Sequence, residues 1–123
     1  MSLPSLVESC TNALAAITPQ TLTPEHLDSS LEILNNVDID TAIDKYWTEL
    51  PTSPEQDNEI PEWQNQIHEK ARELNKRVTG LNNELSRIKE MQAALKIPQL
   101  EEVIRAGQRV VRPLYNFTAQ LNN

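Results

Sequence analysis

The sequence predicts an all-α fold, an elongated helical bundle built around one long helix with a heptad repeat. Apolar residues recur at helical spacing through most of the chain, and glycine-containing hairpin turns and β-branched alternation are almost absent. Only two of the 123 residues are glycine and five are aromatic, so the core has to come from aliphatic stripes on helices. The length is that of one domain, and we expect a single all-α domain over residues 1–123.

The first 50 residues predict three short acidic helices, which we expect to pack by their Leu and Ile faces along the long helix. The first covers about 3–16 with Ser2 as its N-cap, the second begins after Thr23, and Asp38 or Asp40 caps the third. The apolar stripes are Leu3, Leu6, Val7, Cys10, Ala13, Leu14 and Ile17 in the first, Leu27, Leu31 and Leu34 in the second, and Ile39, Ile43, Tyr46, Trp47 and Leu50 in the third.

A proline-rich acidic linker, residues 51–61, precedes a long helix predicted over 61–97. Apolar residues recur there every seven positions in two series, which is the pattern of a coiled-coil seam. The candidate partner-binding seam consists of Ile60, Ile67, Leu74, Val78, Leu81, Leu85, Ile88 and Leu95. The apolar phase passes through Gly80 without a shift, so one continuous helix is favoured. Its length of about 55 Å exceeds the roughly 35 Å diameter of a compact domain of this size. We therefore expect an elongated bundle, or a helix that projects toward a partner.

Residues 98–123 predict a basic C-terminal helix that Pro113 kinks or divides, into about 99–111 and 113–121. Gly107 falls on the apolar face of this helix, where it would let another helix approach closely. A flexible joint at Gly107 is the alternative.

Charge is distributed unevenly along the chain, whose net charge is −7. Residues 1–62 hold 12 acids and one base, a net of −11, and residues 63–123 hold 6 acids and 10 bases, a net of +4. This balance excludes a uniformly basic nucleic-acid binder. Because the boundary coincides with the linker, folding the chain back there would bring the two halves together. We predict that fragments 1–60 and 61–123 associate in trans, more tightly at low salt.

Residues suited to catalysis or metal binding are scarce and scattered. Cys10, His26 and His68 are the only soft ligands, and no two have metal-ligand spacing. Cys10 lies in an apolar stripe, as a small core residue does. No serine has the context of a nucleophile elbow. We expect no catalytic, cofactor-binding or metal-binding residue, and therefore no enzyme and no cofactor.

Two groups of residues outside the seam are candidates for partner binding. Trp47 and Trp63 flank the linker, where they either fill the end of the bundle or serve as exposed anchors. Arg105, Arg109 and Arg112 form a basic stripe on the last helix. A nucleic-acid-associated regulator using this stripe is the alternative function.

The favoured function is a non-enzymatic protein–protein interaction module, an adaptor or small subunit of a larger complex. Its partners would be other protein chains, bound by helix–helix packing along the heptad seam. The seam is poorly tuned for a parallel homodimer, because only one of the three expected charge pairs, Glu84 with Lys89, is complementary. It suits either this chain's own acidic helices or a helix of another protein, in a homo- or hetero-oligomer. No apolar run approaches the ~20 residues of a membrane span, and the single cysteine and absence of a secretory signal pattern favour the cytoplasm or the nucleus.

Overall fold

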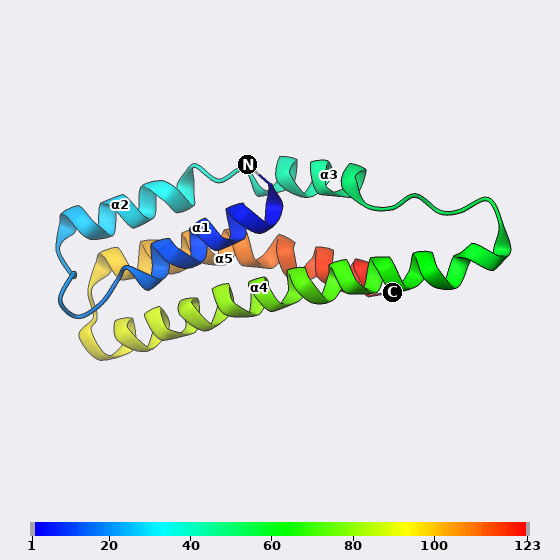
Figure 1. Ribbon diagram of the computed structural model, residues 1–123. Coiled ribbons are helices and arrows are strands. Elements are labelled where there is room, and N and C mark those ends of the chain that lie inside the picture. The colour runs from blue at the N-terminus through cyan, green and yellow to red at the C-terminus, as the bar shows by residue number, and fades with distance from the viewer. Residues whose placement is uncertain (1, 123) are drawn as a thin grey trace.

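The computed structural model describes residues 2–122, which form five α-helices, a single 3-10 turn and no strand (Figure 1). The elements are α1 (Leu3–Ala15), α2 (Pro24–Asn35), α3 (Ile39–Glu49), η1 (Asp57–Glu59), α4 (Ile60–Leu95) and α5 (Pro98–Leu121). The predicted all-α class is confirmed. None of the helices in this range is both long enough and apolar enough to cross a membrane.

Local capping chemistry explains where the short helices begin. The side chains of Ser2, Thr23 and Asp38 each accept a hydrogen bond from a backbone N–H in the first turn of α1, α2 and α3 respectively. Asp38 is therefore the cap that the sequence left undecided between it and Asp40. The long helix α4 ends at Leu95, because Lys96 adopts the left-handed conformation with φ 53°.

The helices pack as an elongated bundle, with α4 and α5 as an antiparallel pair joined by a tight turn at 96–97. In Figure 1, α2 and α3 follow one another along one edge of the bundle. We expected all three short helices to pack along the long helix, but only α1 lies mainly on α4, whereas α2 and α3 pack mainly on α5. The reason is that α1 and α5 together cover the buried stripe of α4, while α5 has buried residues along its whole length.

The middle of α4 forms the centre of the core. Its buried side chains are Ala71, Leu74, Val78, Leu81, Leu85 and Ile88. The helix runs through Gly80 without a break. At 36 residues it is about 54 Å long, and its first 11 residues contribute no fully buried side chain. Figure 1 shows this first part extending beyond the ends of the other helices, beside the linker.

The last helix is continuous, and its close contact with α4 depends on glycine. Pro113 does not divide α5, which runs unbroken with buried Val111 and Leu114 on either side of the proline. A Cβ added to Gly107 would lie 2.7 Å from Cδ1 of Leu85 on α4. Gly107 therefore allows the close helix approach predicted from the sequence.

Arginines of the basic half hold the acidic half through backbone carbonyls. Arg87 of α4 donates to the carbonyl of Leu14 at 2.8 Å, and Arg109 of α5 donates to that of Leu34 at 2.7 Å. Both carbonyls lie in the last turn of a helix, at the negative end of its dipole. Neither α1 nor α2 has a basic residue in its own last turn, so the arginines supply the missing positive charge.

Candidate docking groove at the end of the bundle

The central part of the predicted seam is covered by this chain. Leu74, Val78, Leu81, Leu85 and Ile88 are all buried in the core, at 1% exposure or less. The sequence left open whether the seam packs against the chain's own helices or against a helix of another protein. These five residues pack against the chain's own helices. The ends of the seam differ, because Ile60 and Ile67 are half-buried and Leu95 is 49% exposed.

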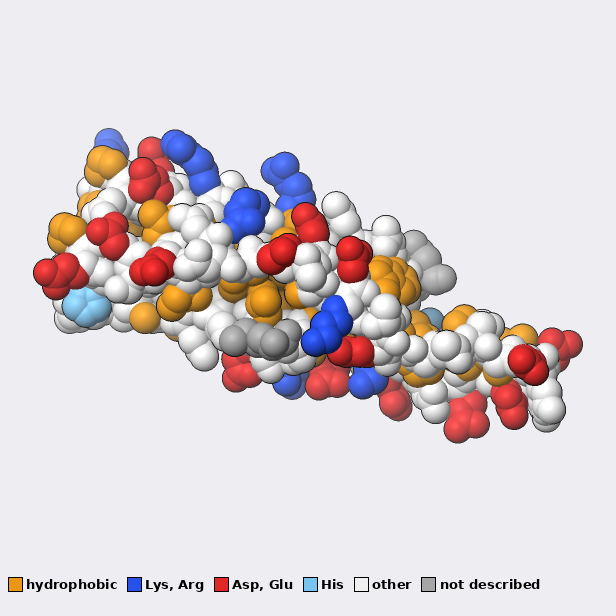
Figure 2. All heavy atoms as spheres, turned by 90° about the horizontal axis from the view of Figure 1, so that it is seen from above, with side chains coloured by type: hydrophobic (Ala, Val, Ile, Leu, Met, Phe, Trp, Pro, Cys, Tyr) orange, Lys and Arg blue, Asp and Glu red, His pale blue; other side chains and the backbone are white. Residues whose placement is uncertain are grey.

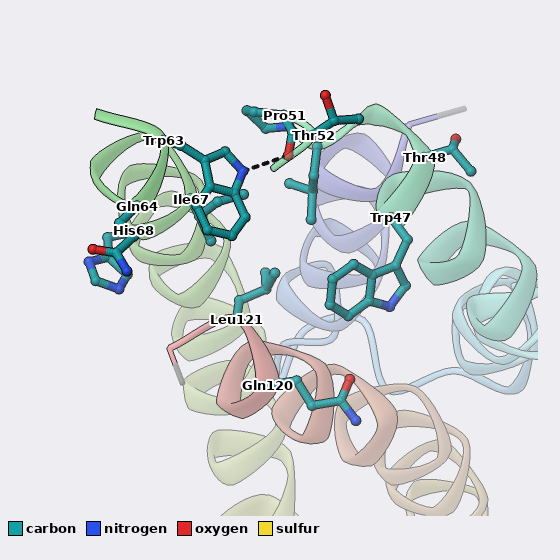
Figure 3. Close-up of a pocket in the computed structure, with 11 residues that line it drawn as sticks. Trp47, Thr48, Pro51, Thr52, Trp63, Gln64, Ile67, His68, Gln120 and Leu121 are labelled. Atoms are coloured by element: carbon teal, nitrogen blue, oxygen red, sulfur yellow. Dashed lines mark hydrogen bonds between the residues drawn. The ribbon is translucent and has the colours of Figure 1, made fainter. Parts of the chain in front are cut away.

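An apolar groove of about 510 Å³ lies at the end of the bundle, beside the half-buried seam residue Ile67. Four segments form it: the end of α3, residues 50–52 that lead into the linker, the start of α4 and the end of α5. Figure 3 shows Trp63 and Trp47 on opposite sides of this groove, with Leu121 below them. Ile67 lies next to Trp63, so the groove contains one residue of the predicted seam and both predicted anchors.

Trp47 is held in place by one face of its ring and open to solvent on the other side. The indole stacks on Phe117 of α5, with ring centroids 5.1 Å apart and planes inclined by 21°. Tyr46 packs edge-on against the same phenyl ring at 5.6 Å. Trp47 nevertheless remains 44% exposed. A fixed and half-exposed indole is the kind of side chain on which a partner's apolar residue can pack at low entropic cost.

Trp63 fixes the opposite wall of the groove to the linker. Its indole Nε1 donates a hydrogen bond of 2.9 Å to the backbone carbonyl of Pro51, drawn as a dashed line in Figure 3. This bond ties the start of α4 to the chain leaving α3. The two aromatic walls are thereby held at a defined separation.

Comparison of the chain with protein families, curated proteins and solved structures gave no match.

The charge around the groove is strongly negative. Residues 46–69 contain six acids and no Lys or Arg; the acids are Glu49, Glu55, Asp57, Glu59, Glu62 and Glu69. Within the described part of the chain, none of their carboxylates makes a hydrogen bond or an ion pair. In Figure 2 the narrow end of the molecule accordingly shows red side chains and no blue ones. The chain segments before and after Trp63 therefore carry unneutralised negative charge, although no carboxylate lines the groove itself.

The predicted basic stripe is divided by the structure. Arg109 is engaged with the carbonyl of Leu34, whereas Arg105 and Arg112 are exposed and, among residues 2–122, have no hydrogen bond or ion pair. All three line a shallow hollow on α5. Two of the three arginines, Arg105 and Arg112, are therefore free to bind a ligand.

The buried titratable groups belong to the core. Cys10 is a fully buried free thiol, and burial raises its pKa to about 11, against a smaller opposite effect of Arg109. Its predicted place in the core is confirmed. Burial also raises the pKa of the Tyr46 hydroxyl, with further contributions from Glu73 and Glu49. Among the described residues there is no group of three or more His, Cys, Asp and Glu side chains that could hold a metal ion.

Part of the groove was not predictable from sequence pattern. The prediction included Trp47, Trp63 and Ile67, but not Pro51 or Leu121, which complete the walls and floor. The spacing of Leu121 from Phe117 indicates a shared buried helix face. No local signal indicates that this face ends beside residues 47 and 63, because that depends on how α5 packs.

Proposed function

We propose that this protein is a non-enzymatic protein–protein interaction module, an adaptor or small subunit of a larger complex, which binds an apolar, base-flanked segment of a partner in the end groove. The observation that carries this proposal is the groove of about 510 Å³, walled by both tryptophans of the chain, in a stretch of sequence with six unpaired acids. The lone cysteine is consistent with a reducing compartment, the cytoplasm or the nucleus.

The composition of the groove favours a peptide segment. Its walls are two indoles, Ile67, Leu50 and Leu121, and tryptophan is the residue type most enriched at binding hot spots. An amphipathic partner helix would place apolar side chains at i, i+3 or i+4 and i+7 in such a groove. The exposed start of α4 would extend that contact, because Ile60 continues the seam beyond Ile67.

The surrounding carboxylates determine the charge of the partner. Six unpaired acids around an apolar groove favour Lys and Arg next to the apolar anchors and oppose acidic segments. Because these acids are exposed, they would act mainly on the association rate and would be screened by salt.

The experiment uses the fluorescence of the chain's two tryptophans, both of which lie in the groove. The probe is a synthetic tryptophan-free peptide of about 18 residues, with Leu and Phe at i, i+3, i+4 and i+7 and Lys elsewhere. We expect a saturable blue shift of the emission, because the bound peptide covers the exposed indole of Trp47. A peptide of the same composition in shuffled order, and one with Glu in place of Lys, should bind at least tenfold more weakly.

Matched variants locate the binding to the groove. Glu59→Lys/Glu62→Lys should weaken binding of the basic peptide, whereas Glu32→Lys/Glu90→Lys makes the same change in net charge elsewhere and should leave it nearly unchanged. Ile67→Ser should weaken binding, and Ile33→Ser, which removes a 45% exposed apolar side chain on α2, should not. Equal binding of ordered and shuffled peptides, or equal effects of groove and control variants, would refute the proposal.

A further inference from the structure

A second surface of the protein carries free positive charge and lies apart from the acidic groove. Three adjoining hollows, of about 370, 260 and 390 Å³, follow the outer side of the α4–α5 pair. The first and third share Arg105, the first and second share Arg112, and the second and third share Lys89. The three hollows are therefore neighbours along one surface, and we call them together the basic trough.

The cations of the trough have no partner within the protein. In the described chain, Lys89, Arg105 and Arg112 make no hydrogen bond or ion pair, although the protein as a whole is acidic. Of the charged residues that line the trough, Glu101 alone is acidic, and it lies at one end. The trough therefore presents an unneutralised positive surface.

The shape of the trough suits one helix. From Glu101 to Asn116 it extends along α5 for 15 residues, which is about 22 Å, or four helical turns. Its floor is apolar, with Leu85 of α4 and Val111 and Ile104 of α5, and Tyr115 is 39% exposed beside it. An amphipathic helix laid between two packed helices needs an apolar floor of this kind with charged edges.

The spacing of the arginines defines the partner more closely. Arg105 and Arg112 are seven residues apart, or about 10.5 Å along α5. Carboxylates seven residues apart on a partner helix that runs along α5 have the same spacing. We propose that the basic trough binds an acidic amphipathic helix of a second protein, with Glu or Asp at i and i+7 and aliphatic residues facing the trough.

A nucleic acid is the competing class of ligand, and the trough favours the helix. Only three free cations line the trough, and phosphate binding draws most of its affinity from many such contacts. The net charge of −7 would repel a long polyanion. This surface does not involve the end groove, so the inference holds or fails independently of the groove's proposed function.

The test measures fluorescence anisotropy of a labelled synthetic peptide of about 16 residues, with glutamates seven apart and leucines on one face. The whole protein should bind it at least tenfold more tightly than a shuffled peptide of the same composition. Arg105→Glu/Arg112→Glu should weaken that binding about tenfold or more. The control Arg72→Glu/Lys76→Glu makes the same change in net charge on an exposed part of α4 and should change the affinity less than twofold.

Two further measurements make the outcome decisive. The variant Arg105→Glu/Arg112→Glu should retain the wild-type helical circular dichroism and the tryptophan response to the basic peptide, so loss of the trough is distinguished from loss of fold and from failure of the groove. A duplex DNA or single-stranded RNA oligonucleotide is the competing ligand. If it binds more tightly than the acidic peptide, and the same variant no longer binds it, the inference is overturned in favour of nucleic acid. Equal weakening by the trough and control variants, or equal binding of the shuffled peptide, would also overturn it.

Discussion

The same substitution, glycine to alanine, should stabilise the protein at one of the two glycines of this chain and not at the other. Both are inside long helices, where alanine is favoured over glycine by about 1 kcal/mol. Around Gly80 an added Cβ meets nothing within 4 Å, so Gly80→Ala should raise the free energy of unfolding by about that amount. At Gly107 the added Cβ would lie 2.7 Å from Cδ1 of Leu85, a side chain that is 1% exposed.

The cost of the clash at Gly107 equals or exceeds the gain in helix propensity. Forcing an extra methyl group into a packed core costs about 1–3 kcal/mol, so Gly107→Ala should range from neutral to about 2 kcal/mol destabilising. The two variants should then differ by about 1–3 kcal/mol. For a chain of this length that corresponds to roughly 4–10 °C in melting temperature.

Urea denaturation followed by helical circular dichroism at pH 7 measures both variants against the wild type, with an unchanged m-value as the check on two-state behaviour.

The double variant Leu85→Ala/Gly107→Ala provides a second test, because shortening Leu85 removes the clash. The cost of Gly107→Ala should fall by at least about 0.5 kcal/mol in that background. Equal stabilisation by Gly80→Ala and Gly107→Ala would refute the close approach of α4 and α5 at this glycine.

Three other predictions concern the core and the contact between the halves. Arg109→Ala should lower the free energy of unfolding by about 1–2 kcal/mol, because the last turn of α2 loses a charged hydrogen-bond donor; Arg105→Ala, as the exposed control, should change it by less than about 0.5 kcal/mol in urea titrations. The raised pKa of the Cys10 thiol, about 11 against 9.0, means that the unfolded chain ionises first as pH rises. Stability should therefore fall between about pH 9 and 11 more steeply in the wild type than in Cys10→Ala, and thiol reagents should modify the native protein only as it unfolds. Fragments 1–56 and 57–123 should associate in calorimetric titrations, more tightly at low salt; no heat of association at low salt would contradict this.

The helices themselves were predictable because their causes are local. Ser2, Thr23 and Asp38 cap the three short helices in the structure, and these residue types before an apolar stripe are the ordinary signal of a helix start. The heptad phase identified which side of α4 is buried, because a helix of fixed period exposes each position at a fixed angle. Even Gly107 could be assigned a packing role, since it lies within the apolar stripe of α5.

The pairing of the helices was not predictable from those patterns. An apolar stripe shows that a helix face is covered but does not specify by which helix, so α2 and α3 were expected on α4 and are found mainly on α5. The end groove has the same origin. Trp47, Trp63 and Leu121 come from three helices, and their proximity results from where α3 and α5 end relative to α4.

The charge asymmetry of the sequence serves the fold only in small part. Between the acidic and basic halves, the described residues form one ion pair, Arg77 with Glu8 at 3.3 Å, and it is exposed, which makes its contribution to stability small. The arginines that bind the other half firmly, Arg87 and Arg109, bind carbonyl groups.

The remaining charges are therefore free to act on partners, and they are segregated. The residues 46–69 that lead into and out of the end groove hold acids and no Lys or Arg, and cations without acids line most of the basic trough. A basic segment is attracted to the first surface and repelled by the second, and an acidic helix has the opposite preference. Two partners of opposite charge could then occupy one molecule without competing, which is the physical requirement for an adaptor. The prediction specific to this arrangement is that saturating the groove with the basic peptide leaves at least half of the trough's affinity for the acidic peptide intact. Mutual exclusion of the two peptides in an anisotropy competition would show that they share one site.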